Sequence, residues 1–269
     1  MILYYVLIGG PAGSGKSTFT SALASWMHDN GLDVAKVNFD PAAEVLPYTP
    51  DVDVRRYINA RDLMIEKGLG PNGALVASVD YLINYVMDIR EEIDETRANY
   101  ALIDLPGQLE IVAFRRLGPL LLKELVKGSK ATMAFLLDVR LVTDPPSAFS
   151  SALLTLSTLY RVAIPMSVVI NKIDLITEMY GPEVPDLKEK IYMLRLLDED
   201  YSCVEAGNSM LFIDTEISQL LCNVFKEALS GEVIPASAKE LVGLDMVYGS
   251  LQRSLAGGED FLTEEASEH

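Results

Sequence analysis

A glycine-rich segment at residues 10–17 carries the clearest chemical signal in the sequence. It reads Gly-Pro-Ala-Gly-Ser-Gly-Lys-Ser and fits the pattern G-x-x-x-x-G-K-[ST], directly after an apolar run and before a helical pattern. In that setting glycines let successive N–H groups face a phosphate, and the helix N-terminus adds its positive end. Lys16 is expected to place its charge on the β- and γ-phosphates of a nucleotide, and the Ser17 hydroxyl to bind Mg²⁺. The predicted phosphate-binding residues are Gly10, Gly13, Ser14, Gly15, Lys16, Ser17 and Thr18.

A second polar motif, Asn-Lys-Ile-Asp at residues 171–174, follows a later apolar run. It is similar to the element with which GTPases read guanine. Asp174 would accept hydrogen bonds from the guanine N1–H and exocyclic amine, whereas adenine would leave this buried carboxylate without donors. The Ser-Ala-Lys segment at residues 237–239 resembles the backbone element that meets the guanine carbonyl. The predicted base-binding residues are Asn171, Lys172, Asp174, Ser237, Ala238 and Lys239.

Two acidic motifs at the ends of apolar runs point to hydrolysis. Residues 104–108 read Asp-Leu-Pro-Gly-Gln and resemble the Asp-x-x-Gly element of GTPases. Asp104 would hold Mg²⁺ through water, the Gly107 N–H would sense the γ-phosphate, and Gln108 would orient the attacking water. Asp40 precedes a proline after another apolar run, where it would contact that water or the Mg²⁺ shell. The alternative for Asp40 is an ordinary turn residue.

These motifs need a scaffold that brings several strand ends together. Short apolar, β-rich runs alternate with helical stretches, and most runs are apolar throughout, as in strands buried on both faces of a parallel sheet. The alternation predicts an α/β fold of the P-loop NTPase class, with a doubly wound, mostly parallel sheet flanked by helices. The expected strands are Leu3–Gly9, Asp33–Asp40, Tyr100–Asp104, Thr132–Asp138, Met166–Asn171 and Val233–Pro235, and the clearest expected helices are Lys16–Asn30, Pro119–Lys127, Pro146–Tyr160 and Lys239–Leu255.

The strand pattern predicts a single domain over residues 1–256, with helical insertions at about 51–99 and 174–230. Residues 257–269 are acidic and contain no Lys or Arg, which predicts a solvated, disordered tail. The first insertion carries an apolar stripe at alternating spacings of four and three. Such a stripe either packs onto the domain's own core or forms a subunit interface. Its members are Leu75, Val79, Leu82, Val86, Ile89 and Ile93.

Composition limits the classes of partner. The chain has 269 residues, of which 49% are apolar, and a formal net charge of −17. An acidic surface repels a phosphate backbone, so direct nucleic-acid binding is not expected. Charged residues or glycines interrupt every apolar run before it reaches the length of a membrane span. The two cysteines, Cys203 and Cys222, are expected to be reduced, and the predicted location is the cytoplasm.

Three motifs in one order make a family resemblance specific. Phe-Asp-Pro-Ala at 39–42, Gly-Pro-Asn at 70–72 and the Asp-x-x-Gly element, following the phosphate loop, resemble the GPN-loop GTPases, and an archaeal-type homodimeric member in particular. The resemblance covers the chain from the first strand to about Leu255. It implies a homodimer in which the loop Gly70, Pro71 and Asn72 of one subunit reaches the nucleotide of the other. Taken alone, the same loop also fits a glycine helix C-cap followed by Asn72 as an N-cap.

The resemblance implies Mg²⁺-dependent hydrolysis of GTP to GDP and phosphate, driving a conformational switch for assembly or maturation of a partner protein complex. A kinase and a module that holds GTP without turnover are the competing classes. Some dimeric P-loop proteins carry an extra Lys early in the loop, which this chain lacks. Arg115 and Arg116 are either cationic stabilisers or surface residues of a helix. The predicted catalytic residues are Lys16, Asp40, Asn72 and Gln108; those at the metal are Ser17, Asp40 and Asp104.

Overall fold

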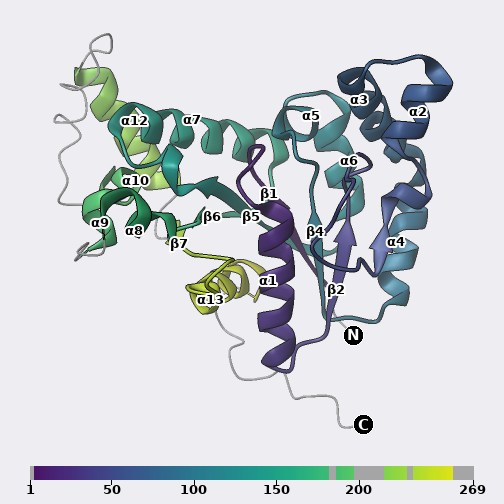
Figure 1. Cartoon of the computed structure of the whole chain (residues 1–269), viewed down its shortest axis with the longest axis horizontal. Helices are drawn as coiled ribbons and strands as arrows, with labels where there is room; N and C mark the ends of the chain where they lie inside the picture. The colour runs from purple at the N-terminus through teal and green to yellow at the C-terminus, as the bar shows by residue number, and fades with distance from the viewer. Residues whose placement is uncertain (1–2, 182–185, 197–214, 229–232, 257–269) are drawn as a thin grey trace.

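The computed structural model describes residues 3–181, 186–196, 215–228 and 233–256. In these residues seven strands form one sheet in the order β3-β2-β4-β1-β5-β6-β7, and every pairing is parallel. The strand β1 lies at the centre, between β4 and β5 (Figure 1). The strands are β1 Tyr4–Gly9, β2 Val34–Asn38, β3 Val52–Asp53, β4 Tyr100–Asp104, β5 Lys130–Asp138, β6 Met166–Asn171 and β7 Val233–Pro235.

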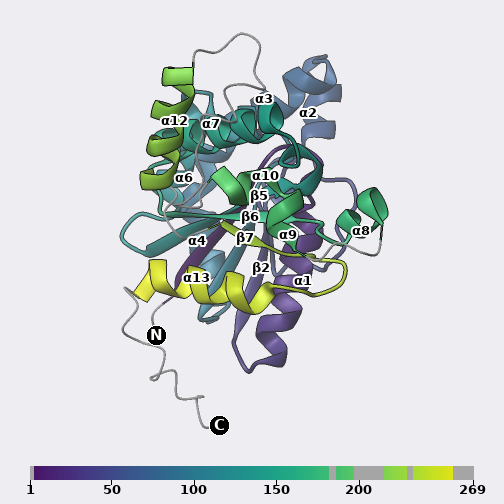
Figure 2. The same cartoon turned by 90° about the vertical axis from the view of Figure 1, so that its left-hand side faces the viewer.

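Helices cover both faces of the sheet because side chains along each strand alternate between two cores. Tyr5 and Leu7 of β1 face one core, with side chains of α3, α4, α6, α7, α10 and α12. Val6 and Ile8 face the other, with α1 and α13 (Figure 2). The helices are α1 Lys16–Asp29, α2 Ala60–Lys67, α3 Pro71–Tyr81, α4 Val86–Glu95, α5 Leu109–Ala113, α6 Leu117–Leu125, α7 Pro145–Val162, α8 Leu175–Tyr180, α9 Leu187–Lys190, α10 Tyr192–Leu196, α12 Thr215–Ala228 and α13 Leu244–Ala256.

The predicted fold class is confirmed; most element ends differ by at most two residues, and one helix start differs by more. The helix expected from Lys239 begins at Leu244, because Ser237 and Val242 first form an antiparallel bridge. Gly243, at φ +76°, ends that turn, and a Cβ there would lie 2.5 Å from the Pro235 carbonyl oxygen. The helix expected over 119–127 is shifted two residues toward the N-terminus.

The first insertion is not wholly helical. It begins with β3, which pairs with β2 at the sheet edge and is too short to show a strand period in the sequence. The predicted stripe then runs through α3, a 3₁₀ turn at Leu82–Tyr85 and α4. Five of its six residues are buried in the chain's own core, so the intramolecular alternative is confirmed for them; Leu75 is partly buried.

In the second insertion the structure describes α8, α9, α10 and α12. Cys222 on α12 is disulfide-bonded, so the expectation of a reduced thiol is wrong there, and Cys203 lies outside the described residues. The predicted tail at 257–269 also lies outside them. Among the helices that are described, none combines the length and apolar composition needed to cross a membrane.

Candidate functional site: a nucleotide site at the carboxyl ends of the strands

The glycine-rich loop joins β1 to α1 in the conformation that its residue types predict. Gly10, Gly13 and Gly15 all have positive φ, at +143°, +78° and +91°. A Cβ on Gly10 would lie 2.3 Å from the Leu136 carbonyl oxygen of β5, so the loop can approach the sheet this closely only with glycine at that position. The turn therefore presents its backbone at the start of α1, where N–H groups favour an anion.

The Lys16 side chain is buried under this loop. Its Nζ donates to the carbonyl oxygens of Gly10 at 2.9 Å, Pro11 at 3.0 Å and Gly107 at 3.2 Å. Lys16 thus connects the phosphate loop with the Asp-x-x-Gly element, as a shared phosphate site requires. Of the hydroxyl residues, Ser14 is buried, Ser17 is partly exposed and Thr18 is exposed.

Buried polar atoms at this point fit a nucleotide with its cation. Ser14 Oγ and Asp104 Oδ1 are both buried and have no hydrogen-bond partner among the described residues. Burial raises the pKa of Asp104 to about 6, against the opposing effect of hydrogen bonding from Ser17 and Tyr48 and of the Lys16 charge. An oxygen-rich pair of Asp104 and Ser17 matches the ligand preference of Mg²⁺.

The described residues contain no cluster of three or more His, Cys, Asp or Glu side chains that would hold a metal. Mg²⁺ bound with a nucleotide uses one or two protein ligands, with water and substrate phosphates completing the shell. Asp104, whose buried Oδ1 has no partner among the described residues, and Ser17 are the residues that would hold the ion.

Asp40 serves both as a turn residue and as a link to the Asp-x-x-Gly loop. Its Oδ1 accepts from the Ala42 N–H at 2.9 Å, which is the turn predicted for an Asp before Pro. Its Oδ2 accepts from the Gly107 N–H at 3.1 Å. The Gly107 N–H, which is predicted to sense the γ-phosphate, is thus hydrogen-bonded to Asp40, a predicted catalytic residue.

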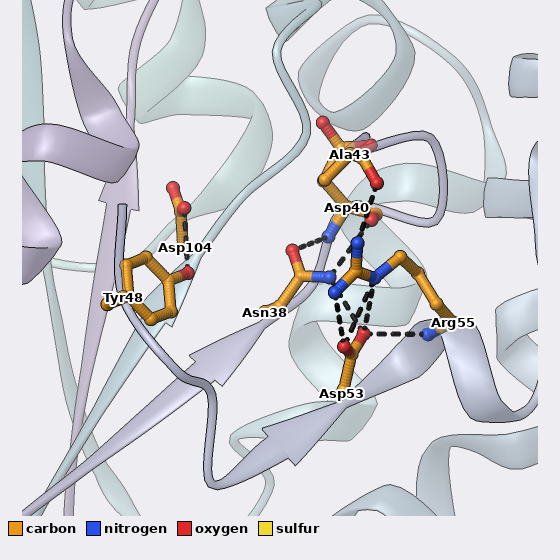
Figure 3. Close-up of polar contacts among 7 residues, drawn as sticks. All are labelled: Asn38, Asp40, Ala43, Tyr48, Asp53, Arg55 and Asp104. Carbon is orange, nitrogen blue, oxygen red and sulfur yellow. Dashed lines mark hydrogen bonds and ion pairs between the residues drawn. The ribbon is translucent and has the colours of Figure 1, made fainter. Parts of the chain in front are cut away.

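A buried network that the sequence reading missed fixes the base of the Asp40 loop (Figure 3). Asn38 donates to Asp53 Oδ1 at 2.8 Å and to the Asp40 carbonyl oxygen at 3.2 Å. Arg55 Nη2 contacts Asp53 Oδ2 at 2.6 Å, and its Nη1 donates to the Ala43 carbonyl oxygen at 2.8 Å. Burial would raise the pKa of Asp53, but hydrogen bonds from Arg55 and Asn38 outweigh it and lower the pKa.

The two predicted base-reading segments meet at the phosphate loop. Asn171 Nδ2 donates to the Ser14 carbonyl oxygen at 2.9 Å, and its Oδ1 accepts from the Ala238 N–H at 3.2 Å. Gly15 allows this contact, since a Cβ there would lie 2.7 Å from Asn171 Nδ2. Asn171 therefore braces the loop, as the motif predicts.

Asp174 is fixed by the second segment. Ser237 Oγ donates to Asp174 Oδ1 at 2.6 Å, and Lys239 Nζ lies 3.8 Å from Asp174 Oδ2. The side chain of Asp174 is 12% exposed to solvent, and that of Lys239 is 67% exposed. The carboxylate is thus oriented by one hydroxyl on Oδ1, while Oδ2 lies near the exposed Lys239.

Lys172 connects the base loop directly to the phosphate loop. It also contacts Asp138, a residue that no motif singled out. Its Nζ donates to the Gly13 carbonyl oxygen at 2.5 Å and to Asp138 Oδ2 at 2.9 Å. Asp138 ends β5, is 6% exposed and also pairs with Arg140. Burial would raise its pKa, but hydrogen bonds from Arg140 and Lys172 lower it well below its usual range.

Asp138→Asn should therefore weaken GDP binding about tenfold, the size of one lost charge-assisted hydrogen bond, because Lys172 would lose its anionic partner. It should also lower the free energy of unfolding at pH 7. Since the folded pKa of Asp138 is depressed, its stabilisation is present above the unfolded pKa of about 3.9 and is lost only as pH falls below that value toward the folded pKa. Fluorescent-GDP titration at pH 7 tests the first effect, and urea unfolding at pH 7 and at about pH 2.5, below the unfolded pKa, tests the second.

Arg140→Ala is the matched control, because Arg140 contacts Asp138 but is 59% exposed and forms no hydrogen bond with the phosphate loop among the described residues. It should leave GDP affinity within about twofold, as expected for an exposed ion pair. Equal GDP affinity in Asp138→Asn and the native chain would contradict a role for Asp138 in holding Lys172.

The Gly-Pro-Asn segment borders an open groove beside this site. Gly68, in the left-handed conformation, ends α2; Gly70 is the N-cap of α3, and Pro71 is its first residue. Asn72 therefore lies inside α3 and is exposed, so the alternative that Asn72 is the N-cap is wrong. The groove has a volume of about 770 Å³ and is lined by Pro41, Ala42, Ala43, Glu44, Arg55, Asn59, Ala60, Arg61, Met64, Pro71, Asn72, Ala74, Leu75 and Gln108.

The groove brings together Asn72, Gln108 and the loop that follows Asp40 within one chain. The two arginines that the sequence suggested as cationic stabilisers do not line this groove. Arg115 is half-exposed and pairs with Asp80 of α3 at 3.5 Å. Arg116 is exposed, as expected for a surface arginine.

A parallel sheet with a glycine-rich phosphate loop after its central strand, and with acidic and Asn-Lys-x-Asp motifs at neighbouring strand ends, defines a P-loop nucleoside triphosphatase. Residues 8–256 match a protein family described as "Conserved hypothetical ATP binding protein".

Comparison with known proteins indicates one family within the P-loop nucleoside triphosphatases. GPN-loop GTPase 3 of Mycosarcoma maydis is 34% identical over 201 residues, which is 73% of this chain and 71% of that protein. GPN-loop GTPase 3 of Kluyveromyces lactis is 36% identical over 178 residues, and the chain covers 66% of its length, just under two thirds. The crystal structure of a Pyrococcus abyssi GTPase in its apo form superposes with a TM-score of 0.73 at 26% identity, over 91% of this chain and 94% of that one.

The chain belongs to the GPN-loop GTPase family. The family predicted from the motif order is thereby confirmed. The named relatives at these identities are eukaryotic, while the similar solved structure is archaeal.

Proposed function

We propose that this chain is a Mg²⁺-dependent GTPase that hydrolyses GTP to GDP and phosphate as an archaeal-type homodimer. The proposal of GTP and not ATP as the nucleotide rests on the arrangement of Asn171, Lys172 and Asp174. Asn171 and Lys172 both donate to carbonyl oxygens of the phosphate loop, and Asp174 is held by Ser237 at the edge of the same site. A carboxylate fixed there accepts the paired donors of guanine, which adenine lacks.

In this proposal each chemical task has its own residue. The phosphate-loop N–H groups and Lys16 bind the β- and γ-phosphates, and Asn171 with Ala238 holds the base loop against them. When bound to Ser17 and Asp104, Mg²⁺ supplies charge neutralisation to the phosphates. Either Asp40, which accepts from the Gly107 N–H, or Gln108 orients the attacking water.

The same contacts support a nucleotide-driven switch. The Gly107 N–H donates to Asp40, and γ-phosphate would compete for this donor, so binding and hydrolysis of GTP would move the loop that carries Asp40. We propose that a partner protein complex reads this movement during its assembly or maturation, in the cytoplasm and without direct contact to nucleic acid or membrane. The net charge of −17 supports the absence of nucleic-acid contact.

Phosphate release from GTP and from ATP, each with Mg²⁺ and over a wide range of protein concentration, tests the proposal. We expect GTP to be preferred and the activity per chain to rise with concentration and then level off, because a second subunit completes the site. Equal turnover of ATP would overturn the choice of guanine and favour a kinase-like class. Tight GTP binding without phosphate release would make the chain a binding module.

A further inference from the structure

The Tyr48 side chain makes a contact that none of the recognised motifs explains. Its hydroxyl donates to Asp104 Oδ2 at 2.8 Å, across 56 positions in the sequence (Figure 3). Tyr48 belongs to the segment between β2 and β3, residues 39–51, which also carries Asp40.

The contact gives the two oxygens of the Asp104 carboxylate different surroundings. Oδ2 accepts from Tyr48, while Oδ1 is buried without a hydrogen-bond partner in the described residues. Ser17, the other predicted Mg²⁺ residue, lies close enough to Asp104 to affect its pKa by hydrogen bonding. A phenol on one oxygen therefore leaves the other, Oδ1, without a partner and available to the proposed metal ion.

The segment that carries Tyr48 is fixed on both sides. After Asp40, Arg55 donates to the Ala43 carbonyl oxygen at 2.8 Å. Beyond Tyr48, the Lys36 N–H donates to Asp51 Oδ2 at 2.7 Å. These anchors to β2 and to the 3₁₀ turn after β3 limit the positions open to the Tyr48 ring, so its contact with Asp104 is a defined one.

We propose that Tyr48 is a positioning residue that orients Asp104 for the Mg²⁺ ion of the bound nucleotide and connects the 39–51 segment to that ion. Outer hydrogen-bond partners of this kind hold carboxylate ligands in their binding orientation. The inference rests on the proposed function, because it requires a nucleotide-bound cation. It adds a residue, Tyr48, through which the movement of the Asp40 loop and the occupancy of the metal site affect each other.

The test is Mn²⁺ binding in the presence of GDP, measured by electron paramagnetic resonance on the native chain and on Tyr48→Phe. The substitution removes one hydroxyl and keeps the ring. We expect the dissociation constant of Mn²⁺ to rise about tenfold, at the lower end of the effect of losing an outer partner. GDP affinity measured in EDTA should stay unchanged, because Tyr48 has no contact with the nucleotide in the proposal.

Tyr57→Phe is the matched control. The Tyr57 hydroxyl also faces a carboxylate, that of Glu92, but lies away from the metal site. It should leave Mn²⁺ affinity unchanged. If Tyr48→Phe is too unstable to titrate, Tyr48→His, which retains a ring N–H donor, is compared with Tyr48→Leu, and the His variant should bind Mn²⁺ more tightly.

Unchanged or tighter Mn²⁺ binding by Tyr48→Phe would overturn the inference and leave the proposed function intact. A parallel loss of Mn²⁺ and metal-free GDP affinity would also overturn it, since it would indicate a merely structural role. Failure of the native chain to bind Mn²⁺ with GDP would instead overturn the proposed metal dependence itself.

Discussion

Asp174→Asn is expected to reverse the base preference of the site from guanine to xanthine. In the proposed pose the Asp174 carboxylate accepts from the guanine N1–H and exocyclic amine. An asparagine amide would instead donate to the additional carbonyl of xanthine. Polar recognition of this type discriminates by about 10⁴-fold, so a change in the GDP-to-XDP affinity ratio of at least about 10³-fold is expected on the same basis.

The contacts of Asp174 allow a change in base preference to be attributed to the new amide group. Ser237 Oγ donates to Oδ1 at 2.6 Å, and an asparagine oxygen in the same position still accepts that bond. The side chain should therefore keep its orientation while its chemistry changes. Competition of GDP, XDP and ADP against a fluorescent GDP analogue measures the ratio, and phosphate release from XTP measures whether hydrolysis follows the base.

Glu240→Gln is the matched control, because it makes the same carboxylate-to-amide change on a neighbouring exposed side chain. Its base preference should equal that of the native chain. If Asp174→Asn also keeps its preference for GDP, the base lies elsewhere. Equal weakening of GDP and XDP would mean that Asp174 only stabilises the loop.

The parts of the site that the sequence predicted are those made by contiguous residues. The phosphate loop and the Asn171–Asp174 motif each carry their functional groups within a few positions, and their spacing is set by one turn after one strand. The alternation of apolar runs with helical stretches then placed both turns at the same edge of a parallel sheet. Fold class and most of the nucleotide site follow from these local patterns.

The parts that were missed are formed by residues far apart in the chain. Asn38, Asp53 and Arg55 meet only because β3 pairs with β2, and a two-residue strand has no readable period. Tyr48 reaches Asp104 from an irregular loop, where no spacing rule applies. Asp138 is different, because it ends an apolar strand just as Asp104 does, and parallel-sheet geometry alone could have added it to the site.

Asn72→Ala is expected to lower GTP hydrolysis about 100-fold, as loss of one positioned donor at the reacting phosphate does in other enzymes, while GDP affinity changes little. The stability of the fold should be nearly unaffected, since Asn72 is exposed on the first turn of α3. Single-turnover phosphate release and GDP titration separate these effects. Asn84→Ala, at an exposed asparagine of the same insertion, should match the native chain in both.

Whether Asn72 acts on its own nucleotide or on that of a second subunit is not decided by its position, because Asn72 and Gln108 line one groove within a single chain. Mixing Asn72→Ala with Asp174→Asn chains, with GTP as the nucleotide, separates the two possibilities. In a mixed dimer the Asn72→Ala chain binds GTP, and only its partner can supply Asn72. Random mixing in equal amounts makes about half of the dimers mixed, each with one complete site, so about one quarter of the native activity should return.

Native mass spectrometry would establish that mixed dimers form, so the recovery can be expressed per mixed dimer. If activity in the mixture equals the average of the two variants although mixed dimers are present, Asn72 acts within its own chain and the exchange of loops between subunits is wrong. Recovery near one quarter would instead make the dimer a requirement of the chemistry. The concentration dependence of phosphate release would then report assembly of the site itself, since a lone chain would lack the amide of Asn72 at its γ-phosphate.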